Sequence, residues 1–233
     1  MILRRSLSTL NASAAIFRRA LPPQDFEFIP DFLSLTDQRI LLSAALQKLD
    51  SMESSGYRRR RKAWVSARHT THPTTSNPLR DIFFPDECYN FEEGHFDGVI
   101  RNYREIHLTS WPDIPGLPSV LERLGSLLPS RDVQTHLLHL ASNGEIFPHV
   151  DNLEASGTWI LGVSLGSQRL LRLEGPENES FEVLLPSGSV YIQRDSLRFN
   201  YKHSIPLKDN GRDGQRVSVM IRTFSGSALR LNH

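Results

Sequence analysis

The stretch Gly144-Glu145-Ile146-Phe147-Pro148-His149-Val150-Asp151 closes an early β-like run with a histidine and an aspartate two positions apart. Side chains at positions i and i+2 of a β-strand project from the same face. His149 and Asp151 can therefore offer an imidazole nitrogen and a carboxylate oxygen to one ion. His203, near the end of a later run, is the candidate third ligand. Two histidines and one carboxylate form the facial triad that suits non-haem Fe(II), because three coordination positions stay open.

From Asp132 onward the chain consists of short β-like runs separated by turn residues, with breaks that include Asn143-Gly144 and Asn210-Gly211. The predicted strands are Val133–Ala141, Ile146–Asp151, Thr158–Leu165, Arg169–Glu174, Phe181–Leu185, Ser189–Gln193, Arg198–Ile205 and Arg216–Phe224. Eight short strands at this spacing predict a β-sandwich or jelly roll. Helical segments precede the strands rather than alternating with them, which disfavours a parallel βαβ fold.

Three helices are predicted ahead of the strands, so the fold class is mainly β with N-terminal helices. Ser34 and Asp37 form a capping box for the first helix, which runs to about Leu49. The second helix is predicted over Glu92 to Glu105, with an apolar, core-facing stripe made of Phe96, Val99, Ile100 and Tyr103. Pro118 opens the third helix. Its expected inward face consists of Val120, Leu121, Leu124 and Leu128.

The segment from Ser51 to Pro85 is polar and is predicted to be irregular. It holds five consecutive basic residues, Arg58 to Lys62. These predict a solvated surface turn, with a patch for an anionic substrate or RNA as the alternative. Cys88 is the only cysteine, which excludes an intramolecular disulfide and favours a reducing compartment. No run approaches the roughly 18 to 20 apolar residues of a membrane helix, so no membrane span is expected.

The first 24 residues contain four arginines, several serines and no acidic residue. Their apolar residues share one face if the segment is helical: Leu3, Leu7, Leu10, Ala14 and Phe17. Such a leader is typical of a mitochondrial presequence, with a disordered basic tail as the alternative. Without those arginines, 23 basic residues face 26 acidic ones, a balance of −3. This charge gives no support to nucleic-acid binding, which relies on a surplus of Lys and Arg.

Arg216 and Arg222 lie six positions apart on the last predicted strand, so both side chains can point to the same face. At about 3.3 Å per residue their backbones are roughly 20 Å apart, which excludes joint binding of one carboxylate group. One arginine can reach toward the metal and the other toward the far end of a bound dicarboxylate, since guanidinium groups pair bidentately with carboxylates. The alternative is that both are surface charges.

These residues resemble the AlkB family of iron- and 2-oxoglutarate-dependent dioxygenases, and within it the mitochondrial branch. The resemblance runs from Glu92 to Arg222. Its motifs are Glu92-Glu93-Gly94-His95-Phe96-Asp97, Gly144 to Asp151, Leu161-Gly162-Val163-Ser164-Leu165, Gly188-Ser189-Val190-Tyr191-Ile192, the stretch around Tyr201 and His203, and Arg216-Val217-Ser218-Val219-Met220-Ile221-Arg222. It implies a double-stranded β-helix (jelly roll) that uses Fe(II), 2-oxoglutarate and dioxygen. Two groups of site residues follow from it: the iron ligands His149, Asp151 and His203, and the 2-oxoglutarate residues Tyr191, Arg216 and Arg222.

The chain departs from the bacterial repair enzymes of this family on the strand before the metal motif. Those enzymes carry an Asn-x-Tyr cosubstrate motif, whereas this chain has Leu138-His139-Leu140. It also has Ser218 where they have asparagine. The mitochondrial branch is thought to lack the nucleotide-holding lid of its relatives. Repair of duplex DNA by base flipping is therefore disfavoured.

The resemblance implies oxidation of a C–H bond while 2-oxoglutarate is decarboxylated to succinate. We expect a mitochondrial matrix enzyme that hydroxylates a protein or small molecule linked to programmed necrosis or fatty-acid metabolism. N-demethylation of mitochondrial transfer RNA precursors is the second hypothesis, which Arg58–Lys62 favour. A non-catalytic, metal-containing jelly-roll scaffold is the third. The expected organisation is a presequence over residues 1–24, a helical and irregular support region over 25–131, the β-helix core over 132–226 and a tail over 227–233.

Overall fold

A computed structural model describes residues 17–18, 24–68, 79–152, 157–176, 179–207 and 214–223. Most of the predicted presequence and all of the predicted tail lie outside these residues. Within the described ranges, no helix is long and apolar enough to cross a membrane. The helices in these ranges are α2 (Leu35–Ser51), α3 (Ser55–Arg68), α4 (Leu117–Gly125) and α5 (Asp195–Asn200), with 3-10 turns η1 (Arg80–Ile82) and η2 (Asp86–Cys88).

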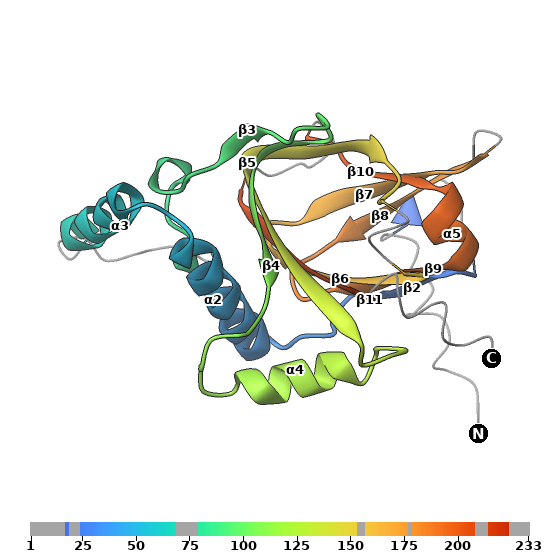
Figure 1. Ribbon diagram of the computed structural model, residues 1–233, viewed down its shortest axis with the longest axis horizontal. Coiled ribbons are helices and arrows are strands. Elements are labelled where there is room, and N and C mark those ends of the chain that lie inside the picture. Colours follow the sequence, from blue (N-terminus) through green and yellow to red (C-terminus); the bar gives the residue numbers. More distant parts are fainter. Residues whose placement is uncertain are drawn as a thin grey trace, which may run out of the picture.

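The strands form one curled antiparallel sheet, shown in Figure 1. They are β1 (Phe17–Arg18), β2 (Phe26–Ile29), β3 (Glu92–Gly94), β4 (Ile100–Leu108), β5 (Val133–His149), β6 (Trp159–Gly166), β7 (Arg169–Glu174), β8 (Ser180–Leu185), β9 (Val190–Arg194), β10 (Lys202–Ile205) and β11 (Arg216–Thr223). β5 pairs with β4 along one edge. Its other edge pairs with β11 over residues 133–140 and with β10 over residues 146–149.

Two branches of the sheet therefore begin at β5. One continues through β11, β6, β9 and β2, and the other through β10, β7, β8 and β1. They form the two walls of a jelly roll, so the predicted fold class is confirmed. β2 and β4, which come from the part of the chain ahead of residue 132, belong to the same sheet.

Helices α2 and α4 cover the outer face of the wall that contains β11 (Figure 1). The outward side chains of β11 that pack in this cluster are Val217, Val219 and Ile221. Met220 packs instead in a second cluster between the two walls. Neighbours on a strand face opposite sides, so the inward side chains of β11 are Arg216, Ser218, Met220 and Arg222.

The first and third predicted helices are confirmed. Ser34 caps α2 by accepting a hydrogen bond from the backbone N–H of Asp37, and the Asp37 carboxylate accepts from the Ser34 backbone. The core-facing side chains of α2 include Leu41, Ala45 and Leu49, all buried. In α4, Val120 and Leu124 are buried and Leu121 is partly buried, while Leu128 lies beyond the helix end.

The predicted helix over Glu92 to Glu105 is wrong, because this segment forms the hairpin of β3 and β4. Gly98 adopts φ 73° in the connecting turn, a left-handed conformation that glycine tolerates. Phe96, expected in the core, is 94% exposed. Val99 and Ile100 pack between the walls, and β4 pairs with β5 along nearly all of its length. Pairing with β5 therefore determines the secondary structure of this segment, although the spacing of its apolar residues also suits a helix.

The predicted turn at Asn143-Gly144 is also wrong, since β5 continues through it. The strand bulges here instead: residues 141–144 of β5 lie opposite the single residue Asn102 of β4, which adopts φ 50° where the register shifts between Arg101 and Tyr103. A Cβ on Gly144 would lie 2.6 Å from the backbone oxygen of Asn102. The glycine therefore permits close approach of two strands rather than a change of direction.

The basic run Arg58–Lys62 lies in α3 rather than in a surface turn. Arg61 is 6% exposed, and its guanidinium forms ion pairs with Glu53 and, at 3.4 Å, with Asp50. Its Nη1 also donates to the backbone oxygen of Cys88 at 2.9 Å. One of the five basic side chains is therefore part of the interior, while the other four are exposed.

We predict that Glu53→Gln lowers the free energy of unfolding by about 3–5 kcal/mol, the cost of removing one partner from a buried ion pair. Glu53 is 8% exposed and its carboxylate binds both Arg61 and Arg104. Urea denaturation checks this result. Glu93→Gln, at an exposed position, is the matched control and should unfold like the wild type.

Candidate active site

The predicted triad residues meet at the open end of β5. His149 is its last residue, Asp151 follows two positions later, and His203 on β10 pairs directly opposite His149. One nitrogen from each imidazole and one carboxylate oxygen all lie within 4.8 Å of one another. The Nε2 atoms of His149 and His203 lie 3.3 and 3.7 Å from Asp151 Oδ1. Among the described residues, this is the single group of three or more such side chains close enough to hold a metal.

One hydrogen bond of His149 determines which of its two ring nitrogens carries the proton and which presents a lone pair to Asp151. Its Nδ1 lies 2.9 Å from the backbone oxygen of Phe147, and a carbonyl can only accept, so Nδ1 donates. In the neutral ring Nε2 is then an acceptor that faces a carboxylate oxygen. Two acceptors at this distance repel each other unless a proton or a metal cation lies between them. The donor set therefore fits a metal ion.

Ionisation of Asp151 and His203 points the same way. Burial alone would raise the pKa of Asp151, but the neighbouring His203, His149 and Arg198 outweigh it and hold that pKa well below its ordinary value. Burial lowers the pKa of His203 to about 4, against the pull of Asp151. At neutral pH the site thus presents an anionic carboxylate beside a neutral imidazole, which are the forms that bind metals. At His149, burial lowers the pKa, but the hydrogen bonds with Asp151 and the Phe147 carbonyl outweigh it and raise that pKa, so a metal would compete with a proton there.

Arg216 is a buried guanidinium without a carboxylate partner among the described residues. It is 1% exposed, and its Nε donates to Ser164 Oγ at 3.0 Å while Nη1 donates to Ser218 Oγ. It also hydrogen-bonds with the phenol of Tyr191. Burial lowers the pKa of Arg216 to about 10, so it stays charged at neutral pH. A buried charge without a counter-ion is costly, so this point of the interior fits a bound anion.

Tyr191 links the guanidinium to the triad. Its phenol interacts electrostatically with both Arg216 and Asp151, and burial raises its pKa so that it keeps its proton. Gly162, opposite Tyr191 on β6, makes room for the ring, because a Cβ there would lie 2.3 Å from Tyr191 Cζ. Tyr191 and Arg216 are thus brought together beside the triad.

Arg222 lies at the other end of the inward face of β11, as its even spacing from Arg216 predicts. It interacts electrostatically with Arg198 and His107, and its Nε is buried without a hydrogen-bond partner among the described residues. Arg222 is therefore near the side of the site that holds Arg198 rather than beside Arg216.

Sequence reasoning missed three residues of the site. Arg198, predicted to start a strand, lies in α5, is 2% exposed and points its Nη atoms at the backbone oxygen of Asp151 from 3.4 and 3.5 Å. Ser164 and Gly162 carried a signal: they are small residues alternating with large apolar ones on β6, which indicates that the inward face leaves space. For Arg198 the sequence held no such signal.

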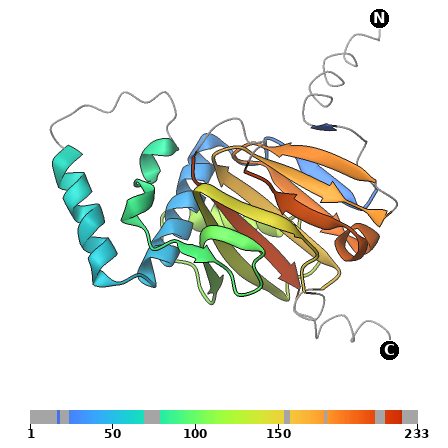
Figure 2. The same ribbon diagram turned by 90° about the horizontal axis from the view of Figure 1, so that it is seen from above.

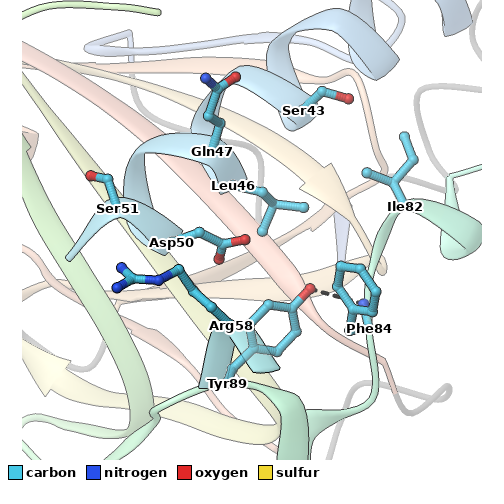
Figure 3. Close-up of a pocket in the computed structure, with 9 residues that line it drawn as sticks. All are labelled: Ser43, Leu46, Gln47, Asp50, Ser51, Arg58, Ile82, Phe84 and Tyr89. Atoms are coloured by element: carbon cyan, nitrogen blue, oxygen red, sulfur yellow. Dashed lines mark hydrogen bonds between the residues drawn. The ribbon is translucent and has the colours of Figure 1, made fainter. Parts of the chain in front are cut away.

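A separate hollow of about 430 Å³ lies between α2 and the segment around η1 and η2 (Figure 3). Its lining residues are Ser43, Leu46, Gln47, Asp50, Ser51, Arg58, Ile82, Phe84 and Tyr89. None of the six predicted site residues belongs to this lining, so this hollow is distinct from the candidate active site.

Residues 25–222 match the model of the 2OG-Fe(II) oxygenase superfamily, and the chain belongs to this family. Its members use Fe(II), 2-oxoglutarate and dioxygen, and the His-Asp-His group fits the iron. The chain is similar to the "Alpha-ketoglutarate-dependent dioxygenase alkB homolog 7, mitochondrial" of Mus musculus and of Bos taurus, at 32% identity over 147 and 148 residues. Each alignment covers 58% of this chain and 66% of the relative. The AlkB-like resemblance found in the sequence is confirmed.

A solved structure described as "The structure of OsALKBH1" has the same fold. It is 17% identical, with a TM-score of 0.51, and the superposition covers 88% of this chain and 99% of that one. This likeness supports the jelly-roll architecture alone.

We predict that Gly162→Ala weakens 2-oxoglutarate binding about 5- to 150-fold, because the new methyl group displaces the Tyr191 ring at a cost of roughly 1–3 kcal/mol. Calorimetric titration of 2-oxoglutarate in the presence of Mn(II) measures it. Gly125→Ala, where an added Cβ meets nothing within 4 Å, is the control. Equal affinity in both variants would contradict the placement of Tyr191 against the cosubstrate.

Proposed function

We propose that this protein is an Fe(II)- and 2-oxoglutarate-dependent dioxygenase, with His149, Asp151 and His203 as the iron ligands. Tyr191, Arg216 and Arg222 are the proposed 2-oxoglutarate residues. The observation that carries the proposal is the juxtaposition of a three-donor metal site with a buried guanidinium that has no counter-ion among the described residues. A metal and a dicarboxylate cosubstrate satisfy both groups together.

Three of the six proposed site residues, His149, Arg216 and Tyr191, have tasks that follow from their surroundings. The Phe147 carbonyl fixes the ring of His149 with Nε2 toward the metal position. Arg216 and the protonated Tyr191 phenol bind one carboxylate of the cosubstrate and thereby fix the orientation of 2-oxoglutarate. The apolar side chains between the walls exclude water. When bound, iron supplies the chemistry that couples decarboxylation of 2-oxoglutarate to oxidation of a substrate C–H bond.

The scaffold hypothesis, in which the metal serves stability alone, leaves Arg216 unexplained. A structural metal has no need of a buried, protonated arginine held by two serine hydroxyls and a phenol. The charge of Arg216 opposes folding unless an anion is bound, which supports an enzyme over a scaffold.

The proposed primary substrate is a protein or small molecule in the mitochondrial matrix, in processes linked to programmed necrosis or fatty-acid metabolism. The mitochondrial names of the relatives and the arginine-rich first 24 residues support this location. The net charge of −3 that remains without those arginines supports a substrate other than nucleic acid. We retain residues 1–24 as the proposed presequence, 25–131 as the support region, 132–226 as the core and 227–233 as the tail.

The proposed activity is tested by succinate release from Fe(II) and 2-oxoglutarate under reducing, aerobic conditions, which needs no primary substrate when turnover is uncoupled. We predict that His149→Ala lowers the rate at least about 100-fold, because a ligand loss exceeds the 10- to 100-fold effect of losing an outer-shell partner. Glu122→Ala, at an exposed position on α4 away from the proposed site residues, should retain the wild-type rate. Equal inactivity of the wild type and His149→Ala would favour the scaffold.

A specific observation favours the second candidate function, N-demethylation of mitochondrial transfer RNA precursors. α3 stands away from the strands, on the far side of α2 (Figure 2), and contains no acidic residue. Its exposed basic side chains are Arg58, Arg59, Arg60 and Lys62. Arg58 and Arg60 donate to backbone oxygens of Glu53 and Glu87, which leaves Arg59 and Lys62 as the side chains best placed for phosphates.

If α3 binds RNA, Arg59→Gln/Lys62→Gln should weaken binding and reduce the slope of log affinity against log salt by about 1.4. This value corresponds to about 0.7 for each of the two single-strand phosphates that the variant can no longer neutralise. Fluorescence anisotropy with a methylated transfer RNA precursor measures both the affinity and the slope. Arg59→Lys/Lys62→Arg keeps the charge and should bind like the wild type. Arg61 must be left intact, since its loss would act through the fold.

A further inference from the structure

His139 is a fully buried histidine that the proposed chemistry does not use. It lies on β5, and three aromatic rings surround it at centroid distances of 4.9 to 5.5 Å: Phe83, Tyr89 and Phe91. Burial, reinforced by the nearby Arg104 guanidinium, holds its pKa well below the ordinary value. The ring is therefore neutral at physiological pH, with one nitrogen donating and the other accepting.

The hydrogen bonds of His139 decide which nitrogen does which. Arg104 Nε lies 2.9 Å from His139 Nδ1, and a guanidinium only donates, so Nδ1 accepts. The ring proton is then on Nε2, which donates to Gln215 Oε1 at 3.0 Å. The Gln215 amide nitrogen donates in turn to the Phe84 carbonyl at 2.7 Å and to Asp86 Oδ1 at 2.6 Å. Each donor meets an acceptor, so the Gln215 side chain has one satisfied orientation.

Gln215 immediately precedes Arg216, at the entrance to β11. Neighbouring residues of an extended chain point to opposite sides. Gln215 therefore reaches outward to His139 and the η2 segment, while Arg216 reaches inward to the proposed cosubstrate position. The backbone oxygen of Gln215 also accepts a hydrogen bond from Ser167 N at 2.9 Å, which ties the same point to the end of β6.

The other end of this chain of hydrogen bonds is anchored on α2. Arg104 Nη1 donates to Asp50 Oδ1 at 2.7 Å and to Glu53 Oε1 at 2.9 Å, and its guanidinium lies 4.2 Å from the centroid of the Tyr89 ring. Figure 3 shows Asp50 and Tyr89 side by side at the edge of the separate hollow. A continuous buried network thus joins α2 to the residue that precedes Arg216.

We infer that His139 and Gln215 are positioning residues that hold Arg216 at the height where it binds 2-oxoglutarate. This inference rests on the proposed function. The need for such a support follows from the sequence of β5: Leu138 and Leu140 face the space between the walls and offer the cosubstrate no side-chain hydrogen bond. The carboxylate that Arg216 binds is therefore held by Arg216 and Tyr191, and a small displacement of the Arg216 backbone reduces the affinity for 2-oxoglutarate directly.

Two variants of His139 distinguish the effect of its hydrogen bond to Gln215 from the effects of its burial and packing. In His139→Asn the amide oxygen stays near the Nδ1 position and accepts from Arg104, but no group reaches Gln215. In His139→Gln the amide nitrogen reaches the Nε2 position and donates to Gln215. Calorimetry with Mn(II) measures the affinity for 2-oxoglutarate, and titration of Mn(II) alone measures the affinity of the triad.

We expect His139→Asn to raise the Kd for 2-oxoglutarate about fivefold, the factor for one lost hydrogen bond, with unchanged Mn(II) affinity. His139→Gln should stay within about twofold of the wild type. Gln215→Met, of similar size but without the amide, should raise the Kd for 2-oxoglutarate by the same factor as His139→Asn. If His139→Asn fails to fold, Gln215→Met still tests the inference.

Wild-type affinity for 2-oxoglutarate in both His139→Asn and Gln215→Met would overturn the inference. An equal loss of Mn(II) affinity would also overturn it, because the effect would then be general loosening. A wild-type protein that binds Mn(II) but not 2-oxoglutarate would overturn the proposed function, and this inference with it. Wild-type binding with unaffected variants overturns the positioning role alone.

Discussion

The length of β5 is the constraint on which the site depends. Its first half shares an edge with β11 and its second half with β10, so one strand belongs to both walls. β5 passes from one wall to the other at residues 141–145, and at its end His149 and His203 face each other with ring centroids 4.2 Å apart. A break at Asn143-Gly144 would have separated the triad from the wall that carries Arg216. The uninterrupted strand keeps both parts of the site in one rigid frame.

Three of the buried arginines, Arg61, Arg104 and Arg216, differ in how their charge is balanced. On the helix side, Arg61 and Arg104 share the carboxylates of Asp50 and Glu53. That network is complete within the protein and serves the fold. Between the walls, Arg216 has only neutral partners among the described residues. The charges of Arg61 and Arg104 are thus compensated within the protein, while the charge of Arg216 is left for a ligand.

The sequence sufficed where a local rule was decisive. The capping box at Ser34 and the bounds of β7 follow from short-range chemistry, and the structure has them as expected. His149 and Asp151 also lie close together as expected, although the strand ends at His149 and Asp151 follows it. Prediction from the sequence failed where pairing with a strand distant in the chain determines the structure. The segment Glu92–Glu105 has spacing that suits a helix, yet β5 supplies an open edge that no local pattern reveals. Arg198 reaches Asp151 only because α5 turns it there.

The facing pair of His149 and His203 has a further consequence for how the protein acquires its metal. Side chains alternate along a strand, so a slip of one residue between β5 and β10 would turn His203 to the wrong side of the sheet. The ion would then find two donors instead of three. Since a ligand that binds one alignment draws the population toward it by mass action, a metal ion held by all three residues would stabilise the correct pairing of β5 with β10.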